Sequence, residues 1–304
     1  MWLLSRLIAG LVFLSSLACT ANATRPVVVT THTVLADIAR ELAGESAEVH
    51  CLVPLGADPH SFEPKPADVR RLTGADLVIE NGLGLEPWSG RMLASSGYAG
   101  AVLRVAEKLP YPLEAAHHDH GHEGHDHGEE ALDPHAWHDP RNGEHYVNGI
   151  ARALTERLPD AAKEIEGRRQ RYVASLQALH ASAAAALGAL PPQARTLVTS
   201  HDALGYFARA YGLRLVPIAG LSPDREPSAR QLARVVTLIR REHVRAVFFE
   251  ATTNPKLTEL VAREAGVSVV RQLYTDSLGL PGTPGATYLG MMQANVDTVL
   301  SALR

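Results

Sequence analysis

Four side chains of metal-binding type stand beyond predicted β-strands. They are His60, His135, His201 and Asp276. In open α/β sheets, ligands bind beyond the carboxyl ends of the strands, so a binding site is expected at these positions. Two of the four fall in each half of the chain, which places the predicted site between the two halves. Three imidazoles and one carboxylate suit a four-coordinate zinc ion.

The elements that must position these side chains alternate between short apolar runs and helical patterns. The first half has predicted strands at Val27–Thr31, Val49–Val53, Leu77–Glu80 and Val102–Ala106. The second half has them at Thr196–Thr199, Leu215–Ile218, Val247–Glu250 and Val267–Leu273. Continuous apolar runs separated by helices indicate parallel sheets that are covered on both faces.

Glycines and a capping box mark the predicted helix ends. Gly44, Gly212 and Gly266 each follow a helical pattern, where glycine suits the left-handed cap. Ser228 and Gln231 have the spacing of a capping box that opens a helix. These signals separate the strands cleanly in both halves.

One long helix is predicted between the halves, from Asp160 to Leu187. The segment is rich in helix-forming residues, and a helix of that length would span roughly 42 Å. We therefore predict two α/β lobes with four strands each, at residues 24–158 and 191–304, bridged by a linker at residues 159–190. The alternative is one large doubly wound sheet, against which the long helix argues.

The first residues have the composition of an export signal. Arg6 is followed by an apolar run that is too short to span a membrane, and Ala21-Asn22-Ala23 resembles a cleavage site. We predict a signal peptide at residues 1–23 and a periplasmic protein. The alternative is a lipoprotein attached through Cys19, but Ser16 stands where that pattern wants an aliphatic residue.

An insertion at residues 117–130 is rich in histidine and lacks apolar side chains, so we expect it to be disordered. Neutral imidazoles in such a loop would bind zinc weakly at several places. The alternative is a solvated insertion without a role in metal handling. The predicted auxiliary zinc ligands of this loop are His117, His118, His120, His122, His125 and His127.

Seven motifs occur in order along the chain, and together they resemble the zinc/manganese solute-binding proteins of ABC transporters. The motifs are PLGADPHSFEPKPADVRRL, NGLGLEPW, DPHAWHDPRNG, TSHDALGYFARAYGL, EPSARQL, FFEATTNPK and YTDSLG. The resemblance implies two lobes joined by a rigid helix with the metal in the cleft. It also implies His60, His135, His201 and Asp276 as the ligands, and a membrane permease as the partner.

His201 does most to select the metal, because manganese-binding members of the family carry a glutamate at this point. Imidazole suits zinc, whereas hard oxygen ligands suit manganese. The predicted cargo is therefore Zn²⁺, with manganese or iron as the alternative. A zinc buffer that serves no transporter is a further alternative.

Other residues near the predicted site are given lesser roles. Glu250 ends a strand and could accept the free N–H of a ligating imidazole, or it could form an ordinary salt bridge. His32 is expected to border the cleft without binding metal. His138 and His145 are expected on the solvated surface. His50, His180 and His243 look like ordinary strand or helix-surface positions, and Trp88 and Trp137 like packing residues.

Several function classes are excluded or disfavoured. The formal net charge is -4 and no basic block occurs, so nucleic acid is not an expected partner. Neither an H-E-x-x-H helix nor a nucleophile elbow is present, and a zinc site closed by four protein ligands leaves no position for a reacting water. We therefore predict a monomeric binding protein that is not an enzyme. Because one stiff helix would join the lobes, we expect little lobe motion, with release by a shift that pulls off a ligand such as Asp276.

Overall fold

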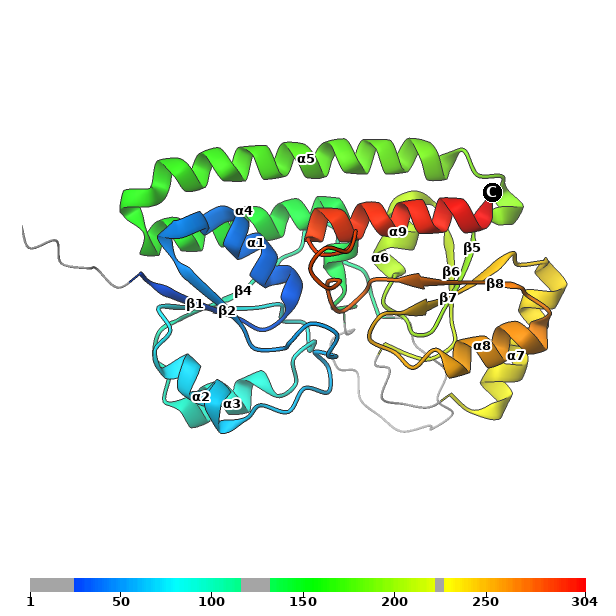
Figure 1. The fold of residues 1–304 in the computed structure, drawn as a ribbon, viewed down its shortest axis with the longest axis horizontal. Coiled ribbons are helices and arrows are strands. Elements are labelled where there is room, and N and C mark those ends of the chain that lie inside the picture. Colours follow the sequence, from blue (N-terminus) through cyan, green and yellow to red (C-terminus); the bar gives the residue numbers. More distant parts are fainter. Residues whose placement is uncertain (1–24, 116–131, 222–226) are drawn as a thin grey trace, which may run out of the picture.

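The computed structural model describes residues 25–115, 132–221 and 227–304. Two four-stranded sheets lie side by side along the long axis of the molecule, and a long helix runs over both (Figure 1). The two-sheet prediction is therefore confirmed, and the single doubly wound sheet is excluded. The predicted signal peptide and the His-rich insertion lie outside the described residues.

The two sheets have the same topology. The first has the order β2-β1-β3-β4 and the second β6-β5-β7-β8, and every strand pairs in parallel with its neighbours. The strands of the first sheet are β1 (Val27–Thr30), β2 (Glu48–Cys51), β3 (Leu77–Glu80) and β4 (Ala101–Arg104). Those of the second are β5 (Thr196–Thr199), β6 (Arg214–Pro217), β7 (Ala246–Glu250) and β8 (Val269–Leu273). All eight lie within two residues of the predicted strands.

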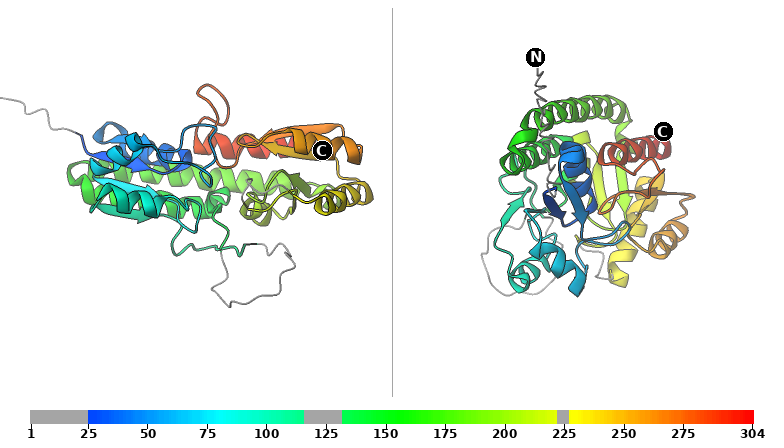
Figure 2. Two further views of the ribbon diagram at one scale, coloured as in Figure 1. Left: turned by 90° about the horizontal axis from the view of Figure 1, so that it is seen from below. Right: turned by 60° about the vertical axis from the view of Figure 1, so that its left-hand side comes forward.

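Helices cover both faces of each sheet, as parallel strands require. The outer faces are covered by α2 (Pro66–Thr73), α3 (Ser89–Ser96), α7 (Ala229–Glu242) and α8 (Lys256–Ala265). The inner faces meet α1 (Thr33–Ala43), α4 (Pro140–Arg157), α5 (Ala162–Gly188), α6 (Gly205–Tyr211) and α9 (Tyr288–Leu303). Figure 2 shows from two further sides how the long helix α5, drawn in green, runs along both halves.

The inner helices bury one continuous apolar core that joins both halves of the chain. It includes Val28 and Ile79 of the first sheet and Leu197 and Phe248 of the second, all of them buried. Helix α5 has 27 residues, so it is about 40 Å long, and its buried Leu176 belongs to the same core. The two halves are therefore packed together along this helical layer.

The local signals behave largely as predicted. Gly212 and Gly266 end α6 and α8 with φ of 65° and 77°, a left-handed conformation that glycine adopts without strain. Ser228 and Gln231 form the predicted capping box at α7. Helix α1 starts at Thr33, whose polar side chain is buried.

Candidate metal centre

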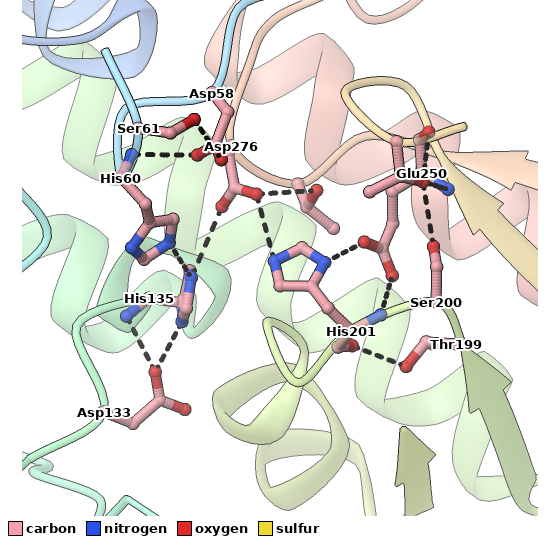
Figure 3. A network of polar contacts seen from close by, with 12 residues as sticks. Asp58, His60, Ser61, Asp133, His135, Thr199, Ser200, His201, Glu250 and Asp276 are labelled. Carbon is pink, nitrogen blue, oxygen red and sulfur yellow. Dashed lines mark hydrogen bonds and ion pairs between the residues drawn. The ribbon is translucent and has the colours of Figure 1, made fainter. Parts of the chain in front are cut away.

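The four predicted ligands lie on segments that meet between the two sheets (Figure 3). His60 lies in the loop between β2 and α2, and His201 lies two residues after β5. Asp276 lies in the segment between β8 and α9. His135 directly precedes η2, a 3-10 turn at Ala136–His138 that leads into α4. The carboxyl ends of the strands thus deliver the ligands to one place.

The ligand atoms of these four residues all lie within 4.8 Å of one another. The Nε2 atoms of His60 and His135 are 3.1 Å apart. The two carboxylate oxygens of Asp276 lie 3.4 Å from His135 Nε2 and 3.1 Å from His201 Nε2. His60 is half-buried and the other three side chains are buried. A cluster of this size and composition can hold one divalent metal ion.

Two buried atoms of the cluster make no well-directed hydrogen bond among the described residues, although each lies close to another ligand atom. They are His201 Nε2 and Asp276 Oδ1, and both point into the cluster. Buried polar atoms are nearly always satisfied in folded proteins. A cation bound between the four side chains would satisfy both atoms, so the donor set fits a metal ion.

Two carboxylates hold two of the ligating rings from behind. Asp133 Oδ1 accepts from His135 Nδ1 at 2.7 Å and from the His135 backbone N–H at 2.9 Å. Glu250 accepts from His201 Nδ1, and its Oε1 accepts from the His201 backbone N–H at 3.1 Å. With Nδ1 as the donor, the lone pair of each ring lies on Nε2, which faces the metal position.

These contacts set the proton affinities of the cluster. Burial alone would lower the pKa of His135, but Asp133 and Asp276 raise it above the usual value. In the same way Glu250 and Asp276 overcome burial and hold the pKa of His201 well above its usual value. Burial would raise the pKa of Asp276, but His201 and His135 keep it far below its usual range. The carboxylate is therefore charged and ready to ligate.

The sequence prediction included Glu250 but missed Asp133. A repeated signal was present, because Asp58-Pro59-His60 and Asp133-Pro134-His135 have the same pattern. In both, an aspartate oxygen accepts the backbone N–H of the histidine two residues later, at 2.8 Å for His60 and 2.9 Å for His135. Each tripeptide is a turn stabilised by aspartate that presents the following imidazole.

Further contacts steady the two turns. Trp88 Nε1 donates to Pro59 O at 2.7 Å, and Asn81 Nδ2 donates to Pro134 O at 2.9 Å. The Tyr206 hydroxyl of α6 donates to Asp133 O at 3.0 Å from the other half of the chain. Trp88 thus has a positioning contact besides the packing role that the sequence predicted.

The prediction that His138 is a solvated surface residue is wrong. His138 is fully buried, because the 3-10 turn after His135 directs its ring against Trp137, with ring centres 5.4 Å apart. His32 is also fully buried, with its ring centre 4.9 Å from that of Trp137, and it lies outside the four-ligand cluster. The ring nitrogens of His32 and His138 have no hydrogen-bond partner among the described residues.

The remaining histidines lie away from the cluster. His145 is half-buried rather than fully solvated, with Nε2 at 3.2 Å from Glu107 O. His50 is half-buried beside Glu48, and His180 is half-buried with its ring centre 5.6 Å from that of Tyr211. His243 is exposed and caps α7 in a left-handed conformation. The six histidines of the predicted auxiliary sites lie outside the described residues.

Most of the chain matches one known protein family. The sequence profile described as "Zinc-uptake complex component A periplasmic", ZnuA, matches residues 28–302. The chain belongs to the ZnuA family. Members of this family are solute-binding proteins that capture a metal ion for an ABC importer, so the chain is an extracytoplasmic binding protein and not an enzyme. Among the described residues, no helix is long and apolar enough to cross a membrane.

Curated ZnuA-family relatives differ in the metal that their names report. The manganese-binding lipoprotein MntA of Halalkalibacterium halodurans is 35% identical over 276 residues, covering 91% of this chain and 88% of the relative. The zinc-binding protein TroA of Treponema pallidum is 32% identical over 284 residues, covering 92% and 89%. The iron-binding protein YfeA of Yersinia pestis is 32% identical over 272 residues, covering 90% and 84%.

Solved structures show the same architecture. The periplasmic zinc-binding protein TroA of Treponema pallidum superposes with a TM-score of 0.82 at 31% identity, covering 92% of this chain and 99% of that one. The ZnuA family and the two-sheet fold are thereby established. Family membership alone leaves the choice among zinc, manganese and iron open, because relatives of similar identity carry each of these metals in their names.

Proposed function

We propose that this protein captures Zn²⁺ outside the cytoplasm and delivers it to an ABC-type importer. The proposed ligands are His60 Nε2, His135 Nε2, His201 Nε2 and a carboxylate oxygen of Asp276. The observation that carries the proposal is the donor set, in which three of the four ligand atoms are imidazole nitrogens. Imidazole suits zinc, and four protein ligands match the coordination number that zinc prefers.

The positions of Asp133 and Glu250 support the same proposal. Each accepts a hydrogen bond from the Nδ1 of a ligating ring, so His135 and His201 face the metal position with Nε2. Carboxylates behind ligating histidines orient the ring and make it a stronger donor. We propose that Asp133 and Glu250 serve this role, which for Glu250 is one of the two interpretations that the sequence offered.

Manganese or iron is the second candidate cargo, because relatives named for these metals are as similar to this chain as the zinc-binding one. A site for manganese would be expected to offer more oxygen ligands than the single carboxylate of Asp276. Glu250 could supply such an oxygen only by breaking its hydrogen bonds to His201. The donor set therefore favours zinc.

The surrounding organisation is part of the proposal. We propose a signal peptide at residues 1–23, lobes at residues 24–158 and 191–304, and a linker at residues 159–190. We also propose a monomer in the periplasm that meets a membrane permease and has no nucleic-acid partner. The His-rich insertion at residues 117–130 would serve as an auxiliary zinc-binding loop.

The test is a competitive titration of the mature chain with Zn²⁺ and Mn²⁺, repeated with residues 117–130 deleted. Deletion removes the weak sites that would obscure the stoichiometry. We expect one tight zinc ion per chain in both forms, and we expect Mn²⁺ to fail to displace it. His201→Glu should lose part of the preference for zinc, because it replaces a nitrogen ligand by an oxygen ligand.

Two outcomes would contradict the proposal. If tight binding disappears with the loop, the four-residue cluster is not the capture site and the chain is a histidine-rich zinc buffer. If Mn²⁺ displaces zinc from the unsubstituted chain, the cargo assignment is wrong. His243→Asn is the matched control, since it removes an exposed histidine far from the cluster and should change neither affinity.

A further inference from the structure

The segment that carries Asp276 belongs to the second half of the chain, but it is hydrogen-bonded to the first half. The backbone N–H of Leu278 donates to Thr33 Oγ1 at 2.9 Å, at the start of α1. Trp137 Nε1 donates to Thr275 O at 3.2 Å. Both contacts are buried, and they lie on either side of Asp276. The carboxylate is thus held between two contacts from the first half.

Two more hydrogen bonds continue this attachment. The backbone N–H of Gly56, in the loop that carries His60, donates to Ser277 Oγ at 2.8 Å. The backbone N–H of Tyr288 donates to Asp37 Oδ2 at 2.8 Å, one turn along α1 from Thr33. The Asp276 segment is therefore joined both to α1 and to the loop of another ligand.

The attachment to its own half is concentrated just before this segment. Tyr274 exchanges two hydrogen bonds with Asn295 of α9, with Tyr274 N to Asn295 Oδ1 at 2.9 Å and Asn295 Nδ2 to Tyr274 O at 2.7 Å. From Thr275 onward, the hydrogen bonds described above, at Thr275, Ser277 and Leu278, join the segment to the first half. The change of attachment therefore falls between Tyr274 and Thr275.

His201 is held differently. Its backbone N–H and its Nδ1 both donate to Glu250 on β7, and its carbonyl oxygen accepts from Thr199 Oγ1 on β5 at 2.8 Å. These contacts fix His201 to the second sheet. The Tyr206 hydroxyl also crosses between the halves, but it bonds to Asp133 O and so steadies His135.

We infer that Asp276 acts as a ligand of the first half of the molecule, grouped with His60 and His135, and that Thr33 and Ser277 are the residues that position it. This inference rests on the proposed function. His201 is then the one ligand that moves with the second sheet. A displacement of that sheet would separate His201 from the other three ligands, whereas the sequence alone suggested that Asp276 would be pulled off.

The inference is tested by a double-mutant cycle on zinc affinity in the full mature chain. Thr33→Val removes the hydroxyl that accepts from Leu278 and keeps the size of the side chain. We expect about a tenfold weaker zinc affinity, the order of one buried hydrogen bond. In an Asp276→Ala background the same change should have no further effect, whereas in a His201→Ala background it should keep its tenfold effect.

Matched variants separate positioning from a loss of fold. Thr33→Ser restores the hydroxyl and should restore the affinity. Ser277→Ala, which removes the contact with Gly56, should reproduce the pattern of Thr33→Val. Thr283→Val is the control, because the Thr283 hydroxyl donates to Leu280 O within the same segment. This hydrogen bond does not join the segment to the first half of the chain. It should leave the affinity unchanged.

Equal effects of Thr33→Val in the two ligand backgrounds would overturn the inference, as would no effect in the unsubstituted chain. The proposed function is judged separately in the same titrations. If the unsubstituted chain fails to bind zinc tightly, the proposed function fails whatever the cycle shows. If it binds tightly and the cycle is additive, only the grouping of Asp276 is wrong.

Discussion

The buried histidines in and around the cluster form two groups, one with a raised pKa and one with a lowered pKa. His135 and His201 face carboxylates, so their pKa values are raised, and protons compete with the metal for these nitrogens. His32 and His138 are buried against the ring of Trp137, and burial lowers the pKa of each to about 3. The second pair therefore stays neutral in the folded protein at any pH well above 3.

Neutral buried histidine makes the free energy of unfolding depend on pH. Above pH 6.5 His138 is neutral in both the folded and unfolded states. As the pH falls from 6.5 towards 3, the unfolded chain binds a proton that the folded chain does not, so stability is lost. At pH 5 the loss amounts to about 2 kcal/mol for this one residue.

His138→Leu should remove that loss, because leucine fills a similar apolar space and does not titrate. We expect the free energy of unfolding of the metal-free variant to fall less between pH 7.5 and pH 5, by about 2 kcal/mol. Urea denaturation at the two pH values measures this. Exposed His243 provides the comparison, and His243→Asn should leave the pH dependence as it was. A His138→Leu variant that loses as much stability as the unsubstituted chain would contradict the prediction.

At the residue scale, the sequence placed His60, His201 and Asp276 near one another because each follows a strand end, and the structure brings these three side chains together with His135. His138 was mispredicted because a polar residue beside a turn usually faces water, and the sequence does not show that a 3-10 turn directs this ring onto Trp137. Burial of a single polar side chain depends on packing that only the folded chain reveals.

At the scale of elements, the helix caps are the clearest link between sequence and structure. The Ser228 backbone N–H donates to Gln231 Oε1 at 2.7 Å, and the Gln231 backbone N–H donates to Ser228 Oγ at 3.3 Å. This reciprocal pair satisfies backbone groups that would otherwise be exposed at the start of α7. Helix α7 covers the outer face of the second sheet, away from the metal cluster.

Ser228→Ala should lower the free energy of unfolding by about 1 kcal/mol, the usual cost of losing such a cap. Zinc affinity should not change, because α7 contributes no ligand. Urea denaturation and zinc titration of the same preparation measure both quantities. Ser228→Thr keeps an oxygen at the cap and should retain most of the stability. An unchanged unfolding curve for the alanine variant would refute the role of the capping box.

Strand positions and the long helix were predictable because their apolar runs and breakers are local signals. The buried contact of Thr33 was not predictable, since its hydroxyl oxygen accepts from Leu278, which lies 245 positions later in the chain. A contact of that kind leaves no local pattern in the sequence. The same reason explains why the attachment of the Asp276 segment to α1 could not be foreseen.

For the whole molecule, the shared core decides how far the halves can move. Helix α5 is continuous from Ala162 to Gly188 and packs on α4, α6 and α9, so both halves contact the same helix. Large hinge closure would require breaking this apolar packing. The sequence predicted a stiff connection from the helix alone, and the structure adds the core that reinforces it.

We therefore expect metal removal to leave the overall dimensions of the protein unchanged. Small-angle X-ray scattering of the metal-free and zinc-loaded chain should give the same radius of gyration within the error of measurement. A clear increase in the metal-free form would mean that the halves separate and that the core is not continuous in solution. The same data would show whether the chain is a monomer.

Burial of His135, His201 and Asp276, with only His60 half-buried, also limits how an ion can leave. We expect a competing ligand in solution to reach an ion held by three buried ligands only after an opening of the protein itself. The rate of exchange would then be set by the chain and not by the concentration of the competitor. A transporter that receives this ion must accordingly act on the shape of its carrier, because offering stronger ligands from outside would achieve nothing.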